Sequence, residues 1–124
     1  MIEGSVPVSF VNVGDRDRAT AFYRDVLGLA LKSSDDFGSF FDMGGALLRM
    51  TPFPHYQAGP HPVLGWNVAD ISAAVADLRG KGVAFTIYEG MGQDADGVWT
   101  SPDGAAKVAW FADSEGNVLS LSEA

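Results

Sequence analysis

The side chains of this chain best suited to metal binding or acid–base catalysis are two histidines and 16 carboxylates, with no cysteine. His55 and His61 are the only histidines, and both lie in the proline-rich stretch TPFPHYQAGPHP. His61 stands two residues before Val63, so the two side chains would share a face along a regular strand. A displaced metal ligand is therefore conceivable at His61. No Asp or Glu has an evident place beside it, which favours histidines that are solvated or packed on a loop.

Asp15 and Asp70 are carboxylates that could serve either as acid–base groups or as helix caps. Each follows a run of strand-forming residues and precedes a helical pattern, where a carboxylate accepts a hydrogen bond from a free backbone N–H group. Helix capping is therefore the predicted role of both. The sequence contains no GxxxxGK, no GxSxG, no plausibly spaced Ser, His and Asp arrangement, and no Cys. It identifies no catalytic residue and no cofactor.

Length and composition set the outer bounds on the class of protein. A chain of 124 residues that is 47% hydrophobic suits a single domain spanning residues 1–124. No apolar run approaches the roughly 18 residues of a membrane span, and the start MIEGSV has no signal-peptide pattern. We expect a soluble, cytoplasmic protein. The net charge of −8 argues against nucleic-acid and anionic-membrane partners.

An internal repeat organises the chain. NVGD at 12–15 returns as NVAD 55 residues later, and DMGGALLR at 42–49 aligns with DSEGNVLS 71 residues later. Two ordered registers indicate a duplication, and the difference between the offsets predicts a 16-residue insertion in the second copy. We expect module one at about 5–54, a linker at about 55–61 and module two at about 62–124.

Each module has the pattern of a strand, a helix and three further strands. In module one, residues at helical spacing lie between Asp15 and Gly28, whose lack of a side chain suits a left-handed helix end. Short β-prone runs separated by turn signals follow. In module two the expected strands are VLGWNV, VAFTIYEG, KVAWFAD and NVLSLSE, with a helix after Asp70.

The repeated NVGD and NVAD junctions, the helix ending AFYRDVLGL and the closing WFADSEGNVLSL resemble the vicinal oxygen chelate superfamily. This superfamily includes glyoxalases, bleomycin resistance proteins and extradiol dioxygenases. The resemblance covers nearly the whole chain. It implies an α+β fold in which two βαβββ modules form a curved mixed sheet around a cavity, with the helices on the outer face. It also implies a homodimer.

The resemblance also indicates where a metal site would lie. Metal-dependent members carry ligands on the first and fourth strand of each module, and the matching positions here are Val8, Arg49, Val63 and Ser120. Divalent metals in such sites need imidazole or carboxylate donors, and an Arg cation is never a ligand. We therefore expect the superfamily's usual metal site to be absent.

Strand alternation predicts which side chains line the implied cavity. Residues two apart along a strand share a face. The inward set is then Val8, Phe10, Asn12, Leu47, Arg49, Thr51, Val63, Gly65, Asn67, Val118, Ser120 and Ser122. Such mixed lining suits a small organic ligand. Asn12 and Asn67 could instead be pseudo-symmetric partners of strand-end backbone groups, and Ser120 and Ser122 could be filler.

Three large aromatic residues are expected to face away from this cavity as core: Tyr23, Trp66 and Trp110. The insertion GMGQDADGVWTSPDG is rich in turn residues. It could form a lid over a ligand with Trp99 as an aromatic wall, or a plain wide hairpin.

These observations favour a metal-independent small-molecule-binding protein of the glyoxalase and bleomycin-resistance type. The predicted ligand-binding residues are Phe10, Asn12, Arg49, Asn67, Trp99 and Ser120. A buried guanidinium needs an anion, so Arg49 is expected to orient a ligand carboxylate, phosphate or enolate-like oxygen. An internal or partner-subunit carboxylate, or an Arg49 side chain that reaches solvent, remain alternatives.

The second hypothesis is a metal-independent lyase, isomerase or hydrolase that acts on a small carbonyl or carboxylate compound. Binding without catalysis is preferred, because the inward set supplies no Asp, Glu, His or Lys as a general base.

Overall fold

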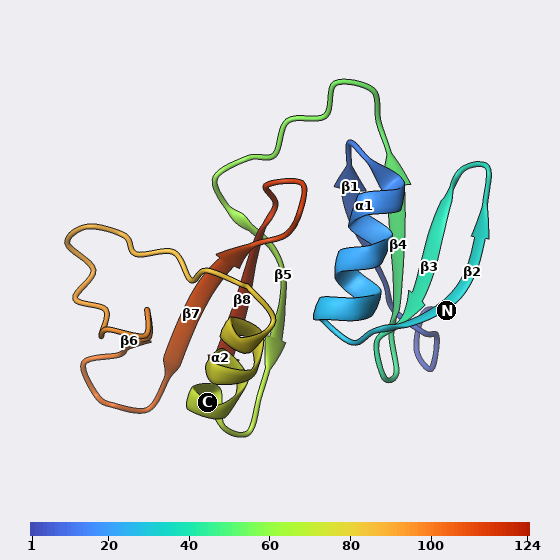
Figure 1. The fold of residues 1–124 in the computed structure, drawn as a ribbon. Helices are drawn as coiled ribbons and strands as arrows, with labels where there is room; N and C mark the ends of the chain where they lie inside the picture. The colour runs from blue at the N-terminus through green and yellow to red at the C-terminus, as the bar shows by residue number, and fades with distance from the viewer. The chain divides into compact units, whose positions relative to one another are not determined.

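Each repeat folds as one strand, one helical segment and three further strands (Figure 1). The computed structural model describes all of residues 1–124, which divide into unit 1, Met1–Gln57, and unit 2, Ala58–Ala124. Unit 1 contains β1 (Val8–Val13), α1 (Arg16–Ala21), η1 (Phe22–Val26), β2 (Ala30–Asp35), β3 (Gly38–Asp42) and β4 (Leu47–Pro52). Unit 2 contains β5 (Pro62–Asn67), α2 (Ile71–Gly80), β6 (Trp99–Thr100), β7 (Lys107–Ala112) and β8 (Val118–Glu123).

The two sheets have the same topology. Strand order is β1-β4-β3-β2 in unit 1 and β5-β8-β7-β6 in unit 2. The first strand of each unit pairs in parallel with the last, and the remaining neighbours are antiparallel. Such a parallel pair cannot be joined by a tight turn, and here the connection runs through the helical segment and the two intervening strands. The predicted α+β fold of two βαβββ modules is confirmed.

Equivalent residues of the two repeats occupy equivalent places in the sheets. Phe10 is the register partner of Arg49 on β1 and β4, and Gly65 is the register partner of Ser120 on β5 and β8. The offsets of 55 and 71 residues found in the sequence relate these two pairs to each other. The duplication is therefore visible in the strand register as well as in the sequence.

The core of unit 1 lies between its sheet and its helical segment. Alternate residues of the strands are buried, among them Val11, Leu48 and Met50. Tyr23, which is completely buried, packs its ring 6.0 Å from that of Phe41. This two-residue alternation leaves one face of the sheet covered by the helix and the other uncovered.

The first helix begins and ends as its sequence predicts. Asp15 accepts a hydrogen bond from the N–H group of Arg18 at 3.1 Å. α1 continues into the π-helical turn η1, where the N–H group of Leu27 donates to the carbonyl of Phe22 at 3.1 Å. Gly28 follows with φ of +75°, a conformation that residues with a side chain rarely adopt.

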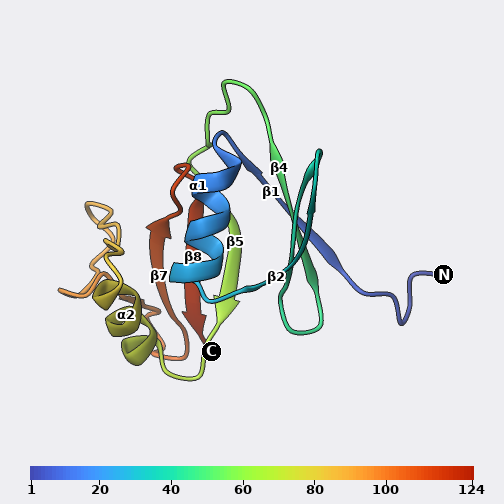
Figure 2. The ribbon, with the colours of Figure 1, turned by 45° about the vertical axis from the view of Figure 1, so that its right-hand side comes forward.

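α2 repeats this arrangement in unit 2. Asp70 accepts a hydrogen bond from the N–H group of Ala73 at 3.1 Å, so both predicted caps are confirmed. Ile71, Val75 and Leu78 form the buried stripe of the helix. α2 contacts β7 and β8, and it lies beside these two strands in both views (Figure 1, Figure 2).

The strand expected at 83–90 does not form. Only Phe85 makes a bridge with β7, to Phe111, and the N–H group of Thr86 donates to the carbonyl of Trp110 at 2.8 Å. Further along β7, the neighbouring strand is β6, whose Trp99 pairs with Val108.

Gln93 gives the physical reason for this difference. Its amide nitrogen donates to the carbonyl oxygens of Thr86 and Gly97 at 2.9 and 2.8 Å, and its amide oxygen accepts from the N–H group of Tyr88 at 2.7 Å. The Gln93 side chain thus hydrogen-bonds to backbone N–H and C=O groups that a neighbouring strand would otherwise satisfy.

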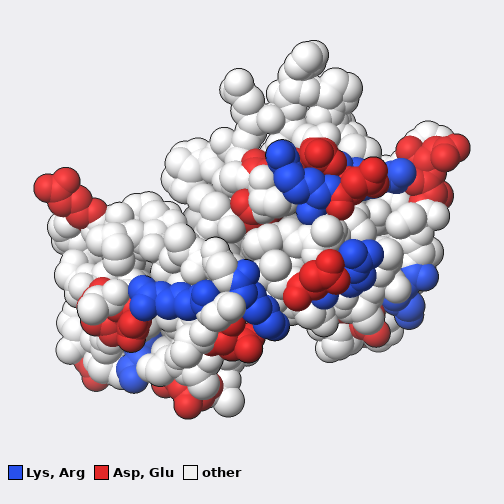
Figure 3. Space-filling model, viewed as in Figure 1, with Lys and Arg blue, Asp and Glu red and all other residues white.

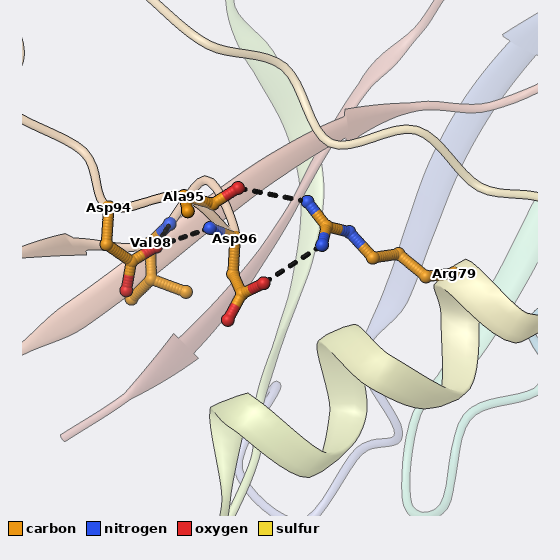
Figure 4. A network of polar contacts seen from close by, with 5 residues as sticks. All are labelled: Arg79, Asp94, Ala95, Asp96 and Val98. Carbon is orange, nitrogen blue, oxygen red and sulfur yellow. Dashed lines mark hydrogen bonds and ion pairs between the residues drawn. The ribbon is translucent and has the colours of Figure 1, made fainter.

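The rest of the insertion is anchored to α2 (Figure 4). The guanidinium of Arg79 donates to the carboxylate of Asp96 at 2.9 Å and to the carbonyl of Ala95 at 3.3 Å. Asp94 accepts hydrogen bonds from the N–H groups of Asp96 and Val98, each at 2.9 Å. Together with the β6–β7 pairing, these contacts give the insertion the form of a wide hairpin.

Acidic and basic side chains lie interspersed on the face seen in Figure 3, within a chain of net charge −8. Neither α1 nor α2 is long and apolar enough to cross a membrane.

Gly38 tests the packing of β3 against β4. A methyl group at this position would overlap the main-chain carbonyl oxygen of Met50, which is part of the sheet and cannot turn away. We expect Gly38→Ala to lower the free energy of unfolding by about 1–3 kcal/mol. Gly59→Ala is the control, because nothing lies within 4 Å of the added group. Equal urea denaturation midpoints for the two variants would contradict this account of the close approach.

Candidate functional site

The helix-free face of unit 1 is defined here as the sheet face opposite α1. Register and alternation place on it Val8, Phe10, Asn12, Phe40, Asp42, Leu47, Arg49 and Thr51. Two of its apolar side chains are prominently exposed, Val8 at 44% and Phe10 at 64%. Large exposed apolar side chains that gather on one face are typical of a binding surface.

Arg49 lies between two phenylalanines on this face. Its register partners are Phe10 on β1 and Phe40 on β3. The guanidinium carbon stands over the Phe40 ring, 5.3 Å from the ring centroid, which is the geometry of a cation–π contact. No carboxylate of unit 1 lies within ion-pair distance of Arg49. Unit 1 therefore supplies no carboxylate counterion for the half-buried Arg49 guanidinium.

The helix-free face does carry acidic residues, Asp42 among them, although the inward set expected from the sequence contained none. Asp42 is the register partner of Leu47 and so points to the same side as Arg49. Its carboxylate accepts a hydrogen bond from the N–H group of Gly44 at 2.9 Å, within the turn between β3 and β4. Asp42 was missed because the inward set covered only the first and last strands, and β3 also contributes to this face.

The corresponding helix-free face of unit 2 is uncharged. By register it carries Gly65, Asn67, Trp99, Val108, Trp110, Val118, Ser120 and Ser122. Ser122 donates a hydrogen bond to the side-chain oxygen of Asn67 at 3.4 Å. A methyl group on Gly65 would overlap the Ser120 hydroxyl, so the glycine leaves space for that side chain.

The expectation for Trp110 is wrong. It is the register partner of Ser120, and it lies on the helix-free face with its ring 5.5 Å from that of Tyr88. The turn from Ala112 to Val118 is one residue longer than the equivalent turn from Asp42 to Leu47. A shift of one residue moves every side chain of a strand to the opposite face.

The other two aromatic expectations are correct. Tyr23 is buried, and Trp66 is the register partner of the buried Leu121 on the side that α2 covers.

The predicted ligand-binding residues fall into two groups. Phe10, Asn12 and Arg49 lie together on the helix-free face of unit 1, and Asn67, Trp99 and Ser120 lie on that of unit 2. Their part in binding stays a prediction. Sequence reasoning missed Phe40, although the alternation in GSFFD, read with the register of the β3–β4 hairpin, would have placed it beside Arg49.

The two histidines are not grouped with carboxylates. His55 and His61 are both exposed, and His55 has a positive φ of 59°. No three or more His, Cys, Asp or Glu side chains are arranged to hold a metal ion.

The groups with shifted pKa values lie outside the helix-free faces. A hydrogen bond from Arg24 lowers the pKa of Asp25 on η1, and the hydroxyl of Ser101 lowers that of Asp103 in the β6–β7 loop. Neither shift marks an acid–base centre, because both arise from local hydrogen bonds at exposed carboxylates.

An open hollow of about 560 Å³ lies at the start of α1. Its lining comprises Gly14, Asp15, Arg16, Asp17, Asp36 and Pro52. It contains none of the predicted ligand-binding residues.

Two βαβββ units, each with one uncovered sheet face, are the arrangement of the Glyoxalase/Bleomycin resistance protein/Dioxygenase superfamily, whose family model matches residues 6–121. The chain belongs to this superfamily. A search of curated proteins finds no match.

Solved structures show the same fold. A glyoxalase family protein from Enterococcus faecalis has a TM-score of 0.77 at 17% identity, with 99% of this chain and 100% of that chain covered. A fosfomycin resistance protein from Listeria monocytogenes has a TM-score of 0.76 at 13% identity, covering 98% and 93%. An antibiotic binding protein from a Streptomyces species has a TM-score of 0.72 at 25% identity, covering 99% and 98%.

The expected absence of the superfamily's usual metal site can be tested. It rests on the residues at the four positions where metal-dependent relatives would hold a metal. With Val8, Arg49, Val63 and Ser120 there, we expect the purified protein to hold no stoichiometric divalent metal. Chelator should leave the melting temperature unchanged. One equivalent of zinc, nickel, manganese or iron by elemental analysis would overturn this expectation.

Proposed function

We propose that this protein binds a small organic anion without the help of a metal, and that Arg49 anchors the anionic group. Phe10 and Asn12 are the proposed accompanying contacts on the helix-free face of unit 1. Asn67, Trp99 and Ser120 are the proposed contacts on that of unit 2. The proposal also places the protein in the cytoplasm, as its composition suggests.

The observation that carries the proposal is the surroundings of Arg49. The guanidinium is half-buried between aromatic side chains and has no carboxylate at ion-pair distance in unit 1. Removing a cation from water without a counterion is costly, and a bound anion would remove that cost. An Arg anchor also gives orientation, since its fork of N–H groups matches a carboxylate.

Binding without catalysis remains the preferred function. The strands of unit 1's helix-free face contribute two carboxylates by register, Asp42 on β3 and Asp35 on β2. Both already accept turn hydrogen bonds, Asp42 from the N–H group of Gly44 and Asp35 from those of Phe37 and Gly38. A general base must lie within hydrogen-bond reach of the proton it removes, and neither face presents a histidine or a lysine from β1, β3, β4, β5, β7 or β8. The resemblance to an antibiotic binding protein at 25% identity also supports binding.

Arg49→Met tests the anchor, because methionine keeps much of the bulk and removes the N–H fork. A screen of small carboxylates, phosphates and aromatic compounds by protein-observed NMR would supply the ligand. We expect the variant to bind the best anionic ligand about 30-fold to 150-fold more weakly, the equivalent of roughly 2–3 kcal/mol for a lost bidentate contact.

Arg24→Met is the matched control. Arg24 is an exposed arginine on η1 that pairs with the neighbouring Asp25 at 2.8 Å. Its loss should leave ligand affinity unchanged. If Arg49→Met keeps full affinity but loses much of its stability, Arg49 has a structural role and the proposed anchor is wrong.

We also propose that the protein is a homodimer. Val8 and Val63 are exposed at 44% and 49% on the first strand of their units, and a second copy would remove such apolar surface from water.

Light scattering should therefore give twice the mass of the 13.1 kDa chain at micromolar concentration. A monomer mass that persists as the concentration rises would refute the dimer.

A further inference from the structure

The geometry around Arg49 points to the class of its ligand, given the anion site proposed above. We infer that the ligand is a singly charged carboxylate attached directly to a flat apolar body, and that Phe10 contacts this body. The inference rests on the proposed function and adds to it the charge and shape of the ligand.

The contact with Phe40 determines which part of the guanidinium stays available. The guanidinium carbon lies over the Phe40 ring, 5.3 Å from its centroid, so the ring shields one side of the group. The N–H groups point outward in the guanidinium plane, and no carboxylate of unit 1 takes them up in an ion pair. A planar carboxylate can lie in that plane and accept two parallel hydrogen bonds. The contact with Phe40 thereby limits the sides from which a carboxylate can approach the guanidinium.

Phe10 then marks where the rest of the ligand lies. It is directly opposite Arg49 on the neighbouring strand β1, and adjacent strands are about 4.8 Å apart. The residue is 64% exposed, although β1 buries Val11 and Val13 on its other face. A ring or other flat apolar group bonded to the carboxylate would reach Phe10 within this distance. Such aromatic contact adds to affinity beyond the area it buries.

Charge decides between a carboxylate and a doubly charged phosphate. Arg49 is the only basic residue in β1, β3 and β4, and Asp42 adds a negative charge to the same face. A monoanion is neutralised by one guanidinium. A dianion would keep an unpaired charge beside apolar side chains and near a carboxylate.

Four probes that differ from one another in shape or in charge test the inference on the full chain. We expect 2-naphthoate to bind at least tenfold more tightly than acetate, 2-naphthamide or 2-naphthyl phosphate in NMR titrations. Acetate lacks the flat body, the amide lacks the charge, and the phosphate carries excess charge. Equal affinity for acetate and 2-naphthoate, tighter phosphate binding, or no binding of 2-naphthoate would each overturn the inference.

Phe10→Ser separates the apolar contact from the anchor. We expect it to weaken 2-naphthoate about tenfold and to leave acetate unchanged. Phe37→Ser is the control, because Phe37 is 72% exposed in the turn between β2 and β3 and lies outside the helix-free face. Thermal melts of both variants would verify that they are folded.

The variants also distinguish failure of the inference from failure of the proposed function. If Arg49→Met weakens carboxylate binding while Phe10→Ser does not affect 2-naphthoate, the anchor stands and the apolar contact is wrong. The same conclusion follows if Phe10→Ser weakens acetate and 2-naphthoate equally. If neither substitution alters the binding of any anion, the anchor itself is wrong.

Discussion

The parallel pairing of the first and last strand in each unit is the constraint on which the rest of the structure depends. It brings Phe10 beside Arg49 and Gly65 beside Ser120, although the members of each pair are far apart in sequence. Parallel strands cannot be joined by a tight turn, so the chain passes through a helix and two further strands before the last strand returns beside the first. Once the helix covers one face, alternation sends every second side chain to the other face.

The two units use this common backbone for different surface chemistry. At the central position of the last strand, unit 1 has Arg49 beside two phenylalanines, whereas unit 2 has Ser120 beside Gly65 and Trp110. Only the first of these positions carries a charge. Duplication therefore preserved the strand pairing that folding requires, while the side chains on the uncovered faces diverged. This separation is why membership of the superfamily defines the fold but does not define the ligand.

The insertion in unit 2 shows how side chains can replace strand pairing. Gln93 makes three hydrogen bonds to main-chain groups of its own loop, and Arg79 and Asp94 make further contacts. Backbone groups must be satisfied, and local side chains can do this without a neighbouring strand. Trp99 of the insertion pairs with Val108 and so lies on the uncovered face of unit 2, and Tyr88, just before the insertion, packs its ring against that of Trp110.

The sequence by itself determined both helix caps and the alternation of β1 and β4, because these features depend on residues close together in the chain. Asp15 and Asp70 are examples, since each cap acts on an N–H group three residues away. The sequence also determined the duplication, because the repeated segments can be aligned with each other without knowledge of the fold. The tertiary structure decided the face of Trp110, the missing strand at 83–90 and the cation–π contact of Arg49 with Phe40. These depend on turn length, on competition between backbone partners and on strand register, which join residues that local patterns treat separately.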